Sequence, residues 1–399
     1  MAETEAVSLP GPPPPEVVCL GESMVTFLPS RPGRLADVPA FTRAIGGAES
    51  NVACALAAAG HRARWVGRVG ADGFGDHLLT AIAAYGVDTG AVRRDPHRPT
   101  GVYFRTDADR ATDAHEVVYY RAGSAASAMD PTTVPYDTVG DGRVLHLTGI
   151  TAALSDGCLA LLRELTAPRP GRPLISFDVN HRPSLWHDDR APGALRELAR
   201  RADLVLVGAD EAERLWGAAD PLAVRALLPE PATLVVKGGE GAAVAFERTP
   251  EAGFPEPGPP GGAGARPVAG AGGAAGATGA AEVPDAAGGC AEAGGCAEAG
   301  GRDAVTVVPA PRVEVVATVG AGDAFAAGFL SALLRGLPMT ARLRHGHLAA
   351  AAALTVPGDL AAPPRRALAD RLAGLDADAW GRLHLGPGWT AADEEVRTR

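Results

Sequence analysis

Short β-branched segments alternate with longer segments rich in alanine and leucine along most of this chain. This alternation predicts an α/β fold in which a mostly parallel sheet is covered by helices. The predicted strands are Val17–Leu20, Ala63–Val69, Val102–Thr106, Val117–Tyr120, Val144–Leu147, Leu174–Asp178, Leu204–Val207, Leu234–Lys237 and Ala243–Phe246. The predicted helices are Ala48–Ala59, Gly75–Tyr85, Asp156–Leu165, Gly193–Arg201, Glu211–Trp216, Leu222–Leu227, Ala321–Leu334 and Ala341–Thr355. In such folds ligands bind at the carboxyl ends of the strands.

Three kinds of segment interrupt the alternation. Val25–Ile45 and Thr100–Arg121 hold short extended runs without a helix between them, so they either pair as a small antiparallel flap or form ordinary surface hairpins. Residues 250–302 are rich in Gly, Ala and Pro and repeat the unit GGCAEA, which predicts a flexible insertion because little large apolar surface is available to offset the ordering entropy. The Pro-rich residues 1–16 are expected to be a disordered tail.

These interruptions leave one domain over residues 17–385. Its expected lid segments are about 24–45 and 99–122, its insertion about 249–303, and its C-terminal tail 386–399.

Charge and cysteine content exclude several classes of function. The net charge of −10 argues against nucleic acid or an anionic membrane as the main partner. We expect no transmembrane helix and no export signal, and hence a cytoplasmic protein. The five cysteines, at positions 19, 54, 158, 290 and 296, lack metal-binding spacing with histidine, and their odd number fits reduced thiols. A metal clip through Cys290 and Cys296 would lack further ligands.

The stretch VVATVGAGDAFAAGFL, residues 315–330, carries the clearest chemistry. Two valines end a strand-like run, and Gly320, Ala321, Gly322 and Asp323 then lead into an apolar helix-like run. Such a turn presents backbone N–H groups at a positive helix end, which suits an anion. Asp323 would repel a phosphate, but it is useful if it removes a proton from a hydroxyl that attacks that phosphate. The alternative is an ordinary helix N-cap.

A second glycine-rich turn lies near the N-terminus. Gly46-Gly47-Ala48-Glu49-Ser50-Asn51 leads into the helix-like run VACALAAAG. The glycine pair allows a close backbone approach, and backbone and amide groups there can bind sugar hydroxyls. A simple glycine turn with a polar cap is the alternative interpretation.

Together these two turns resemble the signatures of the ribokinase-like (PfkB) family of carbohydrate kinases. GGAESNVACALAAAG is similar to the first signature and TVGAGDAFAAGFL to the second. The resemblance implies a three-layer sandwich, with a mostly parallel central sheet, helices on both faces and a small β lid. By contrast, the first predicted strand is followed by GESM instead of the G-x-G-x-x-G expected of a dinucleotide dehydrogenase.

Further segments resemble the 2-dehydro-3-deoxygluconate (KDG) kinase branch of the family. They are LGESMVTFLP, TGVYFR, VVYYRAGSAASAM, LHLTGIT and FDVNHRPSLW. A site for a sugar acid needs a cation to bind the carboxylate. Arginine suits this best, because its planar guanidinium can donate two hydrogen bonds to one carboxylate. Arg121 and Arg182 both follow predicted strands, and Tyr103 and Tyr119 lie in the proposed flap. Either arginine could instead form a surface salt bridge.

The resemblance implies roles for individual positions. Asp323 is the expected catalytic base, with Gly320, Ala321 and Gly322 as an anion hole. The expected substrate contacts are Gly47, Asn51, Tyr103, Tyr119, Arg121, Arg182 and Asp359. The expected nucleotide contacts are Asn180, Gly208, Lys237, Gly239, Gly241 and His347. Glu211 is expected to organise Mg²⁺ through water. ATP and Mg²⁺ are the implied co-substrate and cofactor, and the lid is the implied place for pairing of two copies.

Two positions depart from the family pattern, and the substrate stays open. Ala317 replaces a usual polar residue, so a monovalent-cation site is in doubt, and Gly208 replaces the Asn of an Asn-x-x-Glu element, which weakens the Mg²⁺ inference. The leading hypothesis is phosphorylation of the terminal (C6) hydroxyl of KDG, with the galactonate epimer equally plausible. The alternatives are a kinase of a neutral sugar or nucleoside, such as fructose or ribose, and a non-catalytic sugar-binding protein.

Overall fold

The computed structural model describes residues 13–106, 116–186, 188–239, 241–248 and 303–391. The chain divides into a main unit, residues 1–247 and 305–399, and a second unit, residues 248–304, of which only the ends are described. The insertion predicted at about 249–303, with Cys290 and Cys296, therefore lies almost wholly outside the described residues, as do residues 1–12 of the predicted N-terminal tail.

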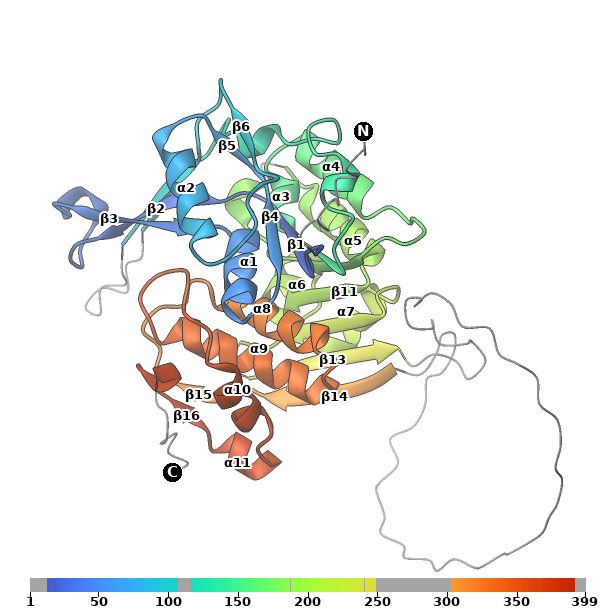
Figure 1. Cartoon of the computed structure of the whole chain (residues 1–399). Helices are drawn as coiled ribbons and strands as arrows, with labels where there is room; N and C mark the ends of the chain where they lie inside the picture. Colours follow the sequence, from blue (N-terminus) through green and yellow to red (C-terminus); the bar gives the residue numbers. More distant parts are fainter. Residues whose placement is uncertain (1–12, 107–115, 187, 240, 249–302, 392–399) are drawn as a thin grey trace, which may run out of the picture. The chain divides into compact units, whose positions relative to one another are not determined.

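An eight-stranded sheet forms the centre of the main unit, in the order β14-β13-β12-β11-β10-β9-β1-β4 (Figure 1). Its strands are β1 Val17–Leu20, β4 Ala63–Val66, β9 Val144–Thr148, β10 Leu174–Asp178, β11 Leu204–Gly208, β12 Thr233–Lys237, β13 Ala242–Arg248 and β14 Asp303–Pro309. All pairs from β4 to β12 are parallel, and β12 pairs with β13 antiparallel. The predicted mostly parallel sheet is confirmed.

Side chains of the central strands alternate between two hydrophobic cores. In β1, Val17 and Cys19 enter one core and Val18 and Leu20 the other, and all four are fully buried. This is the two-sided burial that parallel sheets require. The first core is covered by α1 Ala48–Ala58, α2 Gly73–Ala83, α8 Ala321–Leu334, α9 Met339–Leu354, α10 Arg366–Ala373 and α11 Ala377–Gly381. The second is covered by α3 Gly149–Ala153, α4 Asp156–Leu165, α5 Ala191–Arg201, α6 Ala209–Trp216 and α7 Pro221–Leu227.

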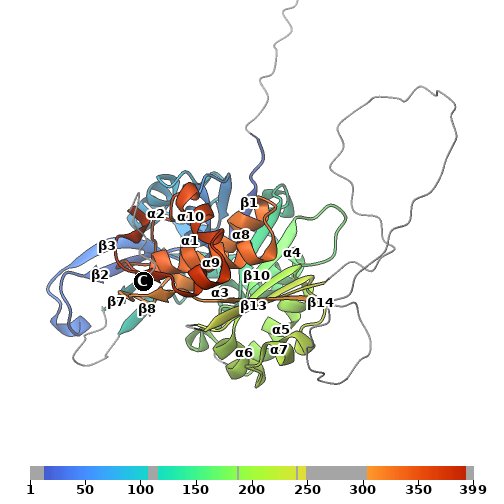
Figure 2. The same ribbon diagram turned by 90° about the horizontal axis from the view of Figure 1, so that it is seen from below.

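Figure 2 shows the resulting three layers of the main unit, with α8, α9 and α10 on one side of the sheet and α5, α6 and α7 on the other. None of the described helices combines the length and the apolar character that crossing a bilayer requires.

A separate four-stranded sheet, which we call the lid, extends from the side of these layers (Figure 2). Its strands are β2 Met24–Pro29, β3 Phe41–Gly46, β7 Val102–Arg105 and β8 Val117–Tyr120, in the order β3-β2-β7-β8. The flap predicted from two distant segments is therefore confirmed. It is not purely antiparallel, however, because β2 and β7 pair in parallel at the join between the two hairpins.

Two short two-stranded sheets complete the strands. They are β5 Arg68–Gly70 with β6 Arg93–Asp95, and β15 Arg312–Val313 with β16 His384–Leu385. The predicted strand Ala63–Val69 is wrong in its second half, because Arg68–Gly70 leaves the central sheet to pair with β6. Single 3₁₀ turns are η1 Leu35–Asp37, η2 Ala126–Ala128, η3 Tyr136–Thr138, η4 Pro183–Leu185 and η5 Trp389–Ala391.

Other differences from the prediction are local. The strand-like run expected up to Val316 is not a strand: β15 ends at Val313, and the Val316 and Ala317 amides donate to the Leu354 carbonyl at the end of α9. Trp389 is buried, so the packed domain extends past residue 385. The remaining predicted helices and strands are present, with ends that agree to within about two residues.

Candidate active site

A cavity of about 930 Å³ lies where the carboxyl ends of the central strands meet the lid. The strand ends contribute Asp178, Gly208 and Lys237, which are the last residues of β10, β11 and β12. The lid contributes its inward side chains, and the N-terminus of α8 closes the floor. The cavity thus occupies the position that the parallel topology predicts for a ligand site.

Asp323 faces this cavity from the first turn of α8. The N-cap of α8 is Gly320, without a side-chain cap, so Asp323 lies three residues into the helix and the N-cap alternative is wrong. Its Oδ2 accepts a hydrogen bond from Asn51 Nδ2 at 2.9 Å, which joins the two signature turns across 272 residues of sequence. Withdrawal from bulk water raises the pKa of Asp323 to about 7, and the Asn51 bond opposes this rise only in part.

The turn before Asp323 has a backbone that only glycine accepts easily. Gly320 has a φ of 79°, and a Cβ there would collide with the carbonyl of Asp359. The chain then enters a 14-residue helix, whose first N–H groups have no partner within the helix. These donors and the helix dipole make an electropositive turn at the cavity floor.

A buried charge cluster lines the strand-end side of the cavity. Lys237, the only lysine in the sequence, places Nζ 3.1 Å from both carboxylate oxygens of Asp178. Burial lowers the pKa of Lys237, but the negative charges of Asp178 and Glu211 more than offset this, so the net shift is upward. Glu211 accepts hydrogen bonds from the amides of Gly208 (2.8 Å) and His181 (3.2 Å), and burial raises the pKa of its carboxyl.

Other residues expected around a nucleotide lie at the same end. Asn180 is buried with a φ of 37°, the single positive φ of a non-glycine residue in the described chain, and such strain concentrates at functional sites. Gly239 lines the cavity, whereas Gly241 does not, and instead donates to the Gly238 carbonyl to close its turn. His347 lines the cavity, makes a hydrogen-bonding contact with the Val308 carbonyl, and has its pKa lowered to about 4 by burial.

The lid side contains a buried triad of Tyr103, Arg105 and Asp359. The Tyr103 hydroxyl donates to Asp359 Oδ2, and Arg105 Nη2 lies 3.3 Å from Asp359 Oδ1. Burial raises the pKa of Asp359, opposed first by Arg105 and then by Tyr103. Burial, the Asp359 charge and the hydrogen bond to Asp359 all raise the pKa of Tyr103. Gly46 leaves room for this triad, because a Cβ at this position would collide with the Tyr103 hydroxyl oxygen and with Asp359 Oδ2.

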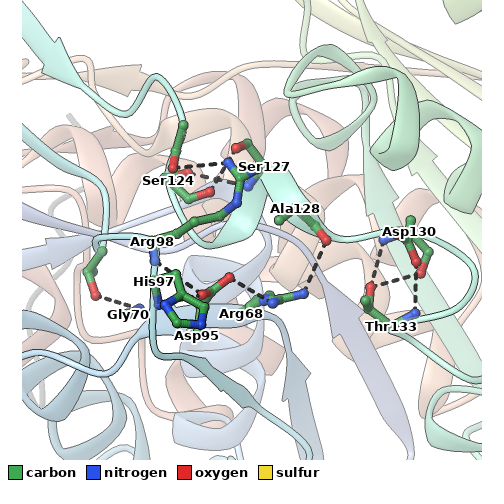
Figure 3. A network of polar contacts seen from close by, with 12 residues as sticks. Arg68, Gly70, Asp95, His97, Arg98, Ser124, Ser127, Ala128, Asp130 and Thr133 are labelled. Atoms are coloured by element: carbon green, nitrogen blue, oxygen red, sulfur yellow. Dashed lines mark hydrogen bonds and ion pairs between the residues drawn. The ribbon is translucent and has the colours of Figure 1, made fainter.

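A second ion pair joins the lid to the β1–β2 loop. Arg121 pairs with Glu22, which is 2% exposed, and Ser124 Oγ donates to Glu22 Oε1 at 2.6 Å. Figure 3 shows how the segment that carries Ser124 is held in place. Arg68 pairs with Asp95 at 2.7 Å and donates to the Ala128 carbonyl at 3.2 Å. The loop after β8 is therefore fixed to β5 and β6.

Arg182 differs from three of the other arginines that line the cavity, which are Arg105, Arg121 and Arg214. Each of those three pairs with a carboxylate. Arg182 is exposed and, like Arg312 at the cavity edge, has no hydrogen bond or ion pair through its side chain among the described residues. Its guanidinium is therefore available to an anion in the cavity.

The structure brings nearly all of the predicted site residues together at this cavity. Its lining includes Gly47, Asn51, Tyr103, Tyr119, Arg121, Arg182, Asp359, Asn180, Gly208, Lys237, Gly239, His347, Glu211, Gly320, Ala321, Gly322 and Asp323, and leaves out only Gly241. Sequence reasoning missed Glu22, Arg105 and Asp178. Asp178 was detectable as a charged residue that ends an apolar strand, and Arg105 as the residue two after Tyr103 on the same strand face.

The carboxylates of the strand-end side fit a magnesium ion that keeps most of its water. Mg²⁺ is usually held by one or two carboxylates together with substrate phosphates. Asp178 and Glu211 supply such oxygens beside Lys237. The described residues contain no group of three or more His, Cys, Asp or Glu side chains that could hold a metal alone.

Comparison with known proteins agrees with this geometry. The family model described as "pfkB family carbohydrate kinase" matches residues 14–264 and 293–366. The 2-dehydro-3-deoxygluconokinase of Bacillus subtilis (strain 168) is 32% identical over 360 residues, which cover 88% of this chain and 93% of that protein. The 2-dehydro-3-deoxygalactonokinase of Haloferax volcanii is 29% identical over 87% of this chain and 93% of its own. Fructokinase-1 of Oryza sativa subsp. japonica is 34% identical over 50% of this chain and 62% of its own.

Solved structures share the fold. A PfkB protein from Polaromonas sp. JS666 has a TM-score of 0.65 and 30% identity, with 86% of this chain and 98% of that chain covered. A proposed ribokinase II of Escherichia coli in complex with ATP and Mg²⁺ has a TM-score of 0.67 and 20% identity, with 90% and 98% covered. The matched signatures, the shared fold and the cavity at the strand ends lead to one conclusion: this chain belongs to the pfkB family of carbohydrate kinases.

Proposed function

We propose that this protein phosphorylates the terminal (C6) hydroxyl of a sugar acid with ATP, with 2-dehydro-3-deoxy-D-gluconate as the leading substrate. The observation that carries this proposal is the unpaired guanidinium of Arg182 in a cavity where Arg105, Arg121 and Arg214 already face carboxylates. An anionic substrate would complete the charge balance of the site. The names of the Bacillus and Haloferax relatives supply independent support.

Asp323 is the proposed base. It accepts the proton of the substrate hydroxyl as the oxygen attacks the γ-phosphorus of ATP; the bond from that phosphorus to the bridging oxygen breaks, and ADP leaves. A pKa near 7 suits this task, since about half of the carboxylates are ionised at neutral pH and each is still basic enough to hold the proton. Asn51 holds the carboxylate toward the cavity. The amides of Gly320, Ala321 and Gly322 are the proposed donors to the charge that develops on the transferred phosphoryl group.

The strand-end side is the proposed binding site for ATP. Lys237 would offer a point charge to its phosphates, while Asn180, Gly208, Gly239, Gly241 and His347 stay predictions as nucleotide contacts. Asp178 and Glu211 are the proposed water-mediated partners of Mg²⁺, which neutralises phosphate charge when bound. Ala317 offers no side-chain ligand to a monovalent cation at the expected position.

The lid side is the proposed sugar site. Tyr103, Tyr119, Arg121 and Asp359 point into the cavity beside Gly47 and Asn51. Hydroxyl and carboxylate groups of this kind fix the orientation of a polyhydroxylated ligand by directed hydrogen bonds.

A neutral sugar is the second candidate substrate, because fructokinases are among the relatives at comparable identity. Phosphoryl transfer to KDG, its galactonate epimer, fructose and ribose, measured side by side, separates the candidates. Replacing Arg182 with Ala should raise the KM for KDG about 10- to 100-fold, as expected for loss of a charge-assisted bond, and change the KM for ATP little. Equal or faster turnover of fructose by the wild-type protein would overturn the sugar-acid assignment.

Pairing of two copies through the lid also stays a prediction. The outer face of the lid carries a cluster of aromatic rings, including Phe27 stacked on Phe104, and leaves Tyr120 64% exposed. An apolar face of this kind is typical of an interface. Light scattering of the purified protein, with Tyr120→Asp as the variant, tests the prediction.

A further inference from the structure

We propose that Arg105 is a positioning residue that holds the Asp359 carboxylate toward the sugar, and so couples the lid to the anion-binding turn of α8. This inference rests on the proposed function, since it requires that the lid side of the cavity receives a sugar. It concerns a residue that the sequence motifs did not single out, and it acts through Asp359.

Arg105 lies at the end of β7 and is 3% exposed. Its Nη2 faces Asp359 Oδ1 at 3.3 Å, and Asp359 is the one carboxylate that it contacts within ion-pair distance in the described chain. The Arg105 Nε is buried without a hydrogen-bond partner, as is Asp359 Oδ1. The two charges therefore depend on each other, and each still has capacity for one further polar partner.

Both residues that hold Asp359 come from the same lid strand. Tyr103 and Arg105 are two positions apart in β7, so they project from the same face of the lid, and the Tyr103 hydroxyl occupies the other oxygen of Asp359. Within the part of the chain that the structure describes, these are the titratable and charged groups that act on Asp359. The other elements packed against it, the end of β3 and the N-terminus of α8, present Gly46 and Gly320, which have no side chains.

Asp359 also contacts the turn that precedes the proposed base. Its backbone carbonyl packs directly on Gly320, so a displacement of residue 359 would press on that turn. A lid that holds the Asp359 side chain therefore also holds the loop against the α8 N-terminus. Arg105 is the charged part of this connection, whereas Tyr103 is the neutral part.

Loss of the Arg105 charge should change the chemistry of Asp359 as well as its position. Burial already favours the protonated carboxyl, and Arg105 is the main group that opposes this. Loss of Arg105 should therefore raise the pKa of Asp359 further and favour the protonated carboxyl, in which one oxygen donates a hydrogen bond instead of accepting one. Sugar binding should then weaken at neutral pH and recover at higher pH, as the carboxyl ionises again.

The test compares Arg105→Met, Arg105→Lys, Asp359→Asn and the double variant Arg105→Met/Asp359→Asn in the full-length protein, with the sugar that the wild type turns over. We expect Arg105→Met to raise the sugar KM about tenfold or more at pH 7, as for loss of a charge-assisted contact, with the KM for ATP nearly unchanged. The ratio of this KM to the wild-type KM should fall as pH rises from 6 to 9. Arg105→Lys should restore most of the loss, and Arg105→Met should add little in the Asp359→Asn background.

The outcomes separate this inference from the proposed function. If the wild type transfers phosphate to none of the sugars, the proposed function fails before the variants are compared. If the wild type is active but the KM ratio for Arg105→Met is the same at every pH, or if its effect is undiminished in the Asp359→Asn background, Arg105 is structural and the inference is overturned. Thermal unfolding of each variant identifies any that fail to fold. If Arg105→Met does not fold, the double variant is compared with Asp359→Asn instead, because the double variant leaves no unpaired charge at this site.

Discussion

The two sides of the cavity are built in different ways. The strand-end side takes Asp178 and Lys237 from the carboxyl ends of β10 and β12, two strands of one sheet that is buried on both faces. The lid side takes Tyr103 and Arg105 from a small separate sheet. These two side chains contact Asp359, which lies in a loop and is 256 residues from Tyr103 in the sequence. One side is therefore positioned by a rigid core, and the other by ion pairs that must form across the cavity.

The charges differ in the same way. On the strand-end side Lys237 pairs with Asp178 and also interacts electrostatically with Glu211, so two carboxylates share one lysine in an arrangement that Mg²⁺ would complement. On the lid side each of Arg105 and Arg121 has its own carboxylate. The comparison indicates that the phosphate chemistry and the sugar recognition can be changed separately, and the predictions below test this.

Asp323→Asn should have the largest effect, because it removes the proposed base that lies between the two sides. We expect kcat to fall about 10²- to 10⁴-fold, the usual contribution of general base catalysis, while the KM values for sugar and ATP change little. A coupled assay for ADP release measures this effect. Asp137→Asn, at an exposed carboxylate of η3, is the matched control. Retained turnover in Asp323→Asn would contradict the proposed chemistry.

The pH profile is the next largest effect. Asp323 must be ionised to accept a proton, and its pKa is raised to about 7. Activity should therefore fall about tenfold for each pH unit below 7 and level off above it. Initial rates at saturating ATP and sugar, from pH 5 to 9, measure the profile. A rate that stays constant down to pH 5 would show that no group with this pKa controls the reaction.

Lys237→Met should then distinguish the strand-end side from the lid side. Loss of the charge should raise the KM for ATP about tenfold or more, by removing a charge-assisted contact, and leave the KM for the sugar nearly unchanged. Lys237→Arg keeps the charge and serves as the control. Equal changes in both KM values would show that the two sides are not independent.

The same contrast explains how much of the site could be predicted from sequence. Asp323 and the glycine turn were identified because a helix start and its neighbouring residues are local in sequence. Asp178 could have been found by the same logic, as the last residue of a correctly predicted strand. The strand predicted up to Val316 was wrong. β-branched residues favour strands, but here hydrogen bonds to the end of α9 determine the backbone conformation.

The ion pairs of the lid could not be read from sequence in the same way. Glu22 lies 102 residues from Ser124, and Arg105 and Asp359 are brought together only by the packing of the lid against the loop after α9. In a chain with 37 Lys and Arg residues, no local pattern tells which arginine meets which carboxylate. The lid itself was predicted, but not its parallel β2–β7 join, because register and direction depend on tertiary contacts.

Tyr119→Phe should have the smallest effect, and it tests the lid side without disturbing its ion pairs. Tyr119 lies opposite Tyr103 in the lid, lines the cavity and is 44% exposed, and its hydroxyl has no hydrogen-bond partner in the described chain that its loss would leave unpaired. Removal of this hydroxyl should cost one neutral hydrogen bond to the sugar, so the sugar KM should rise about two- to tenfold while the KM for ATP stays constant. Tyr120→Phe, on the outer face of the same strand, should change neither value. If Tyr119→Phe altered the KM for ATP instead, the lid would have to contribute to ATP binding, and the conclusion that the two sides act separately would be wrong.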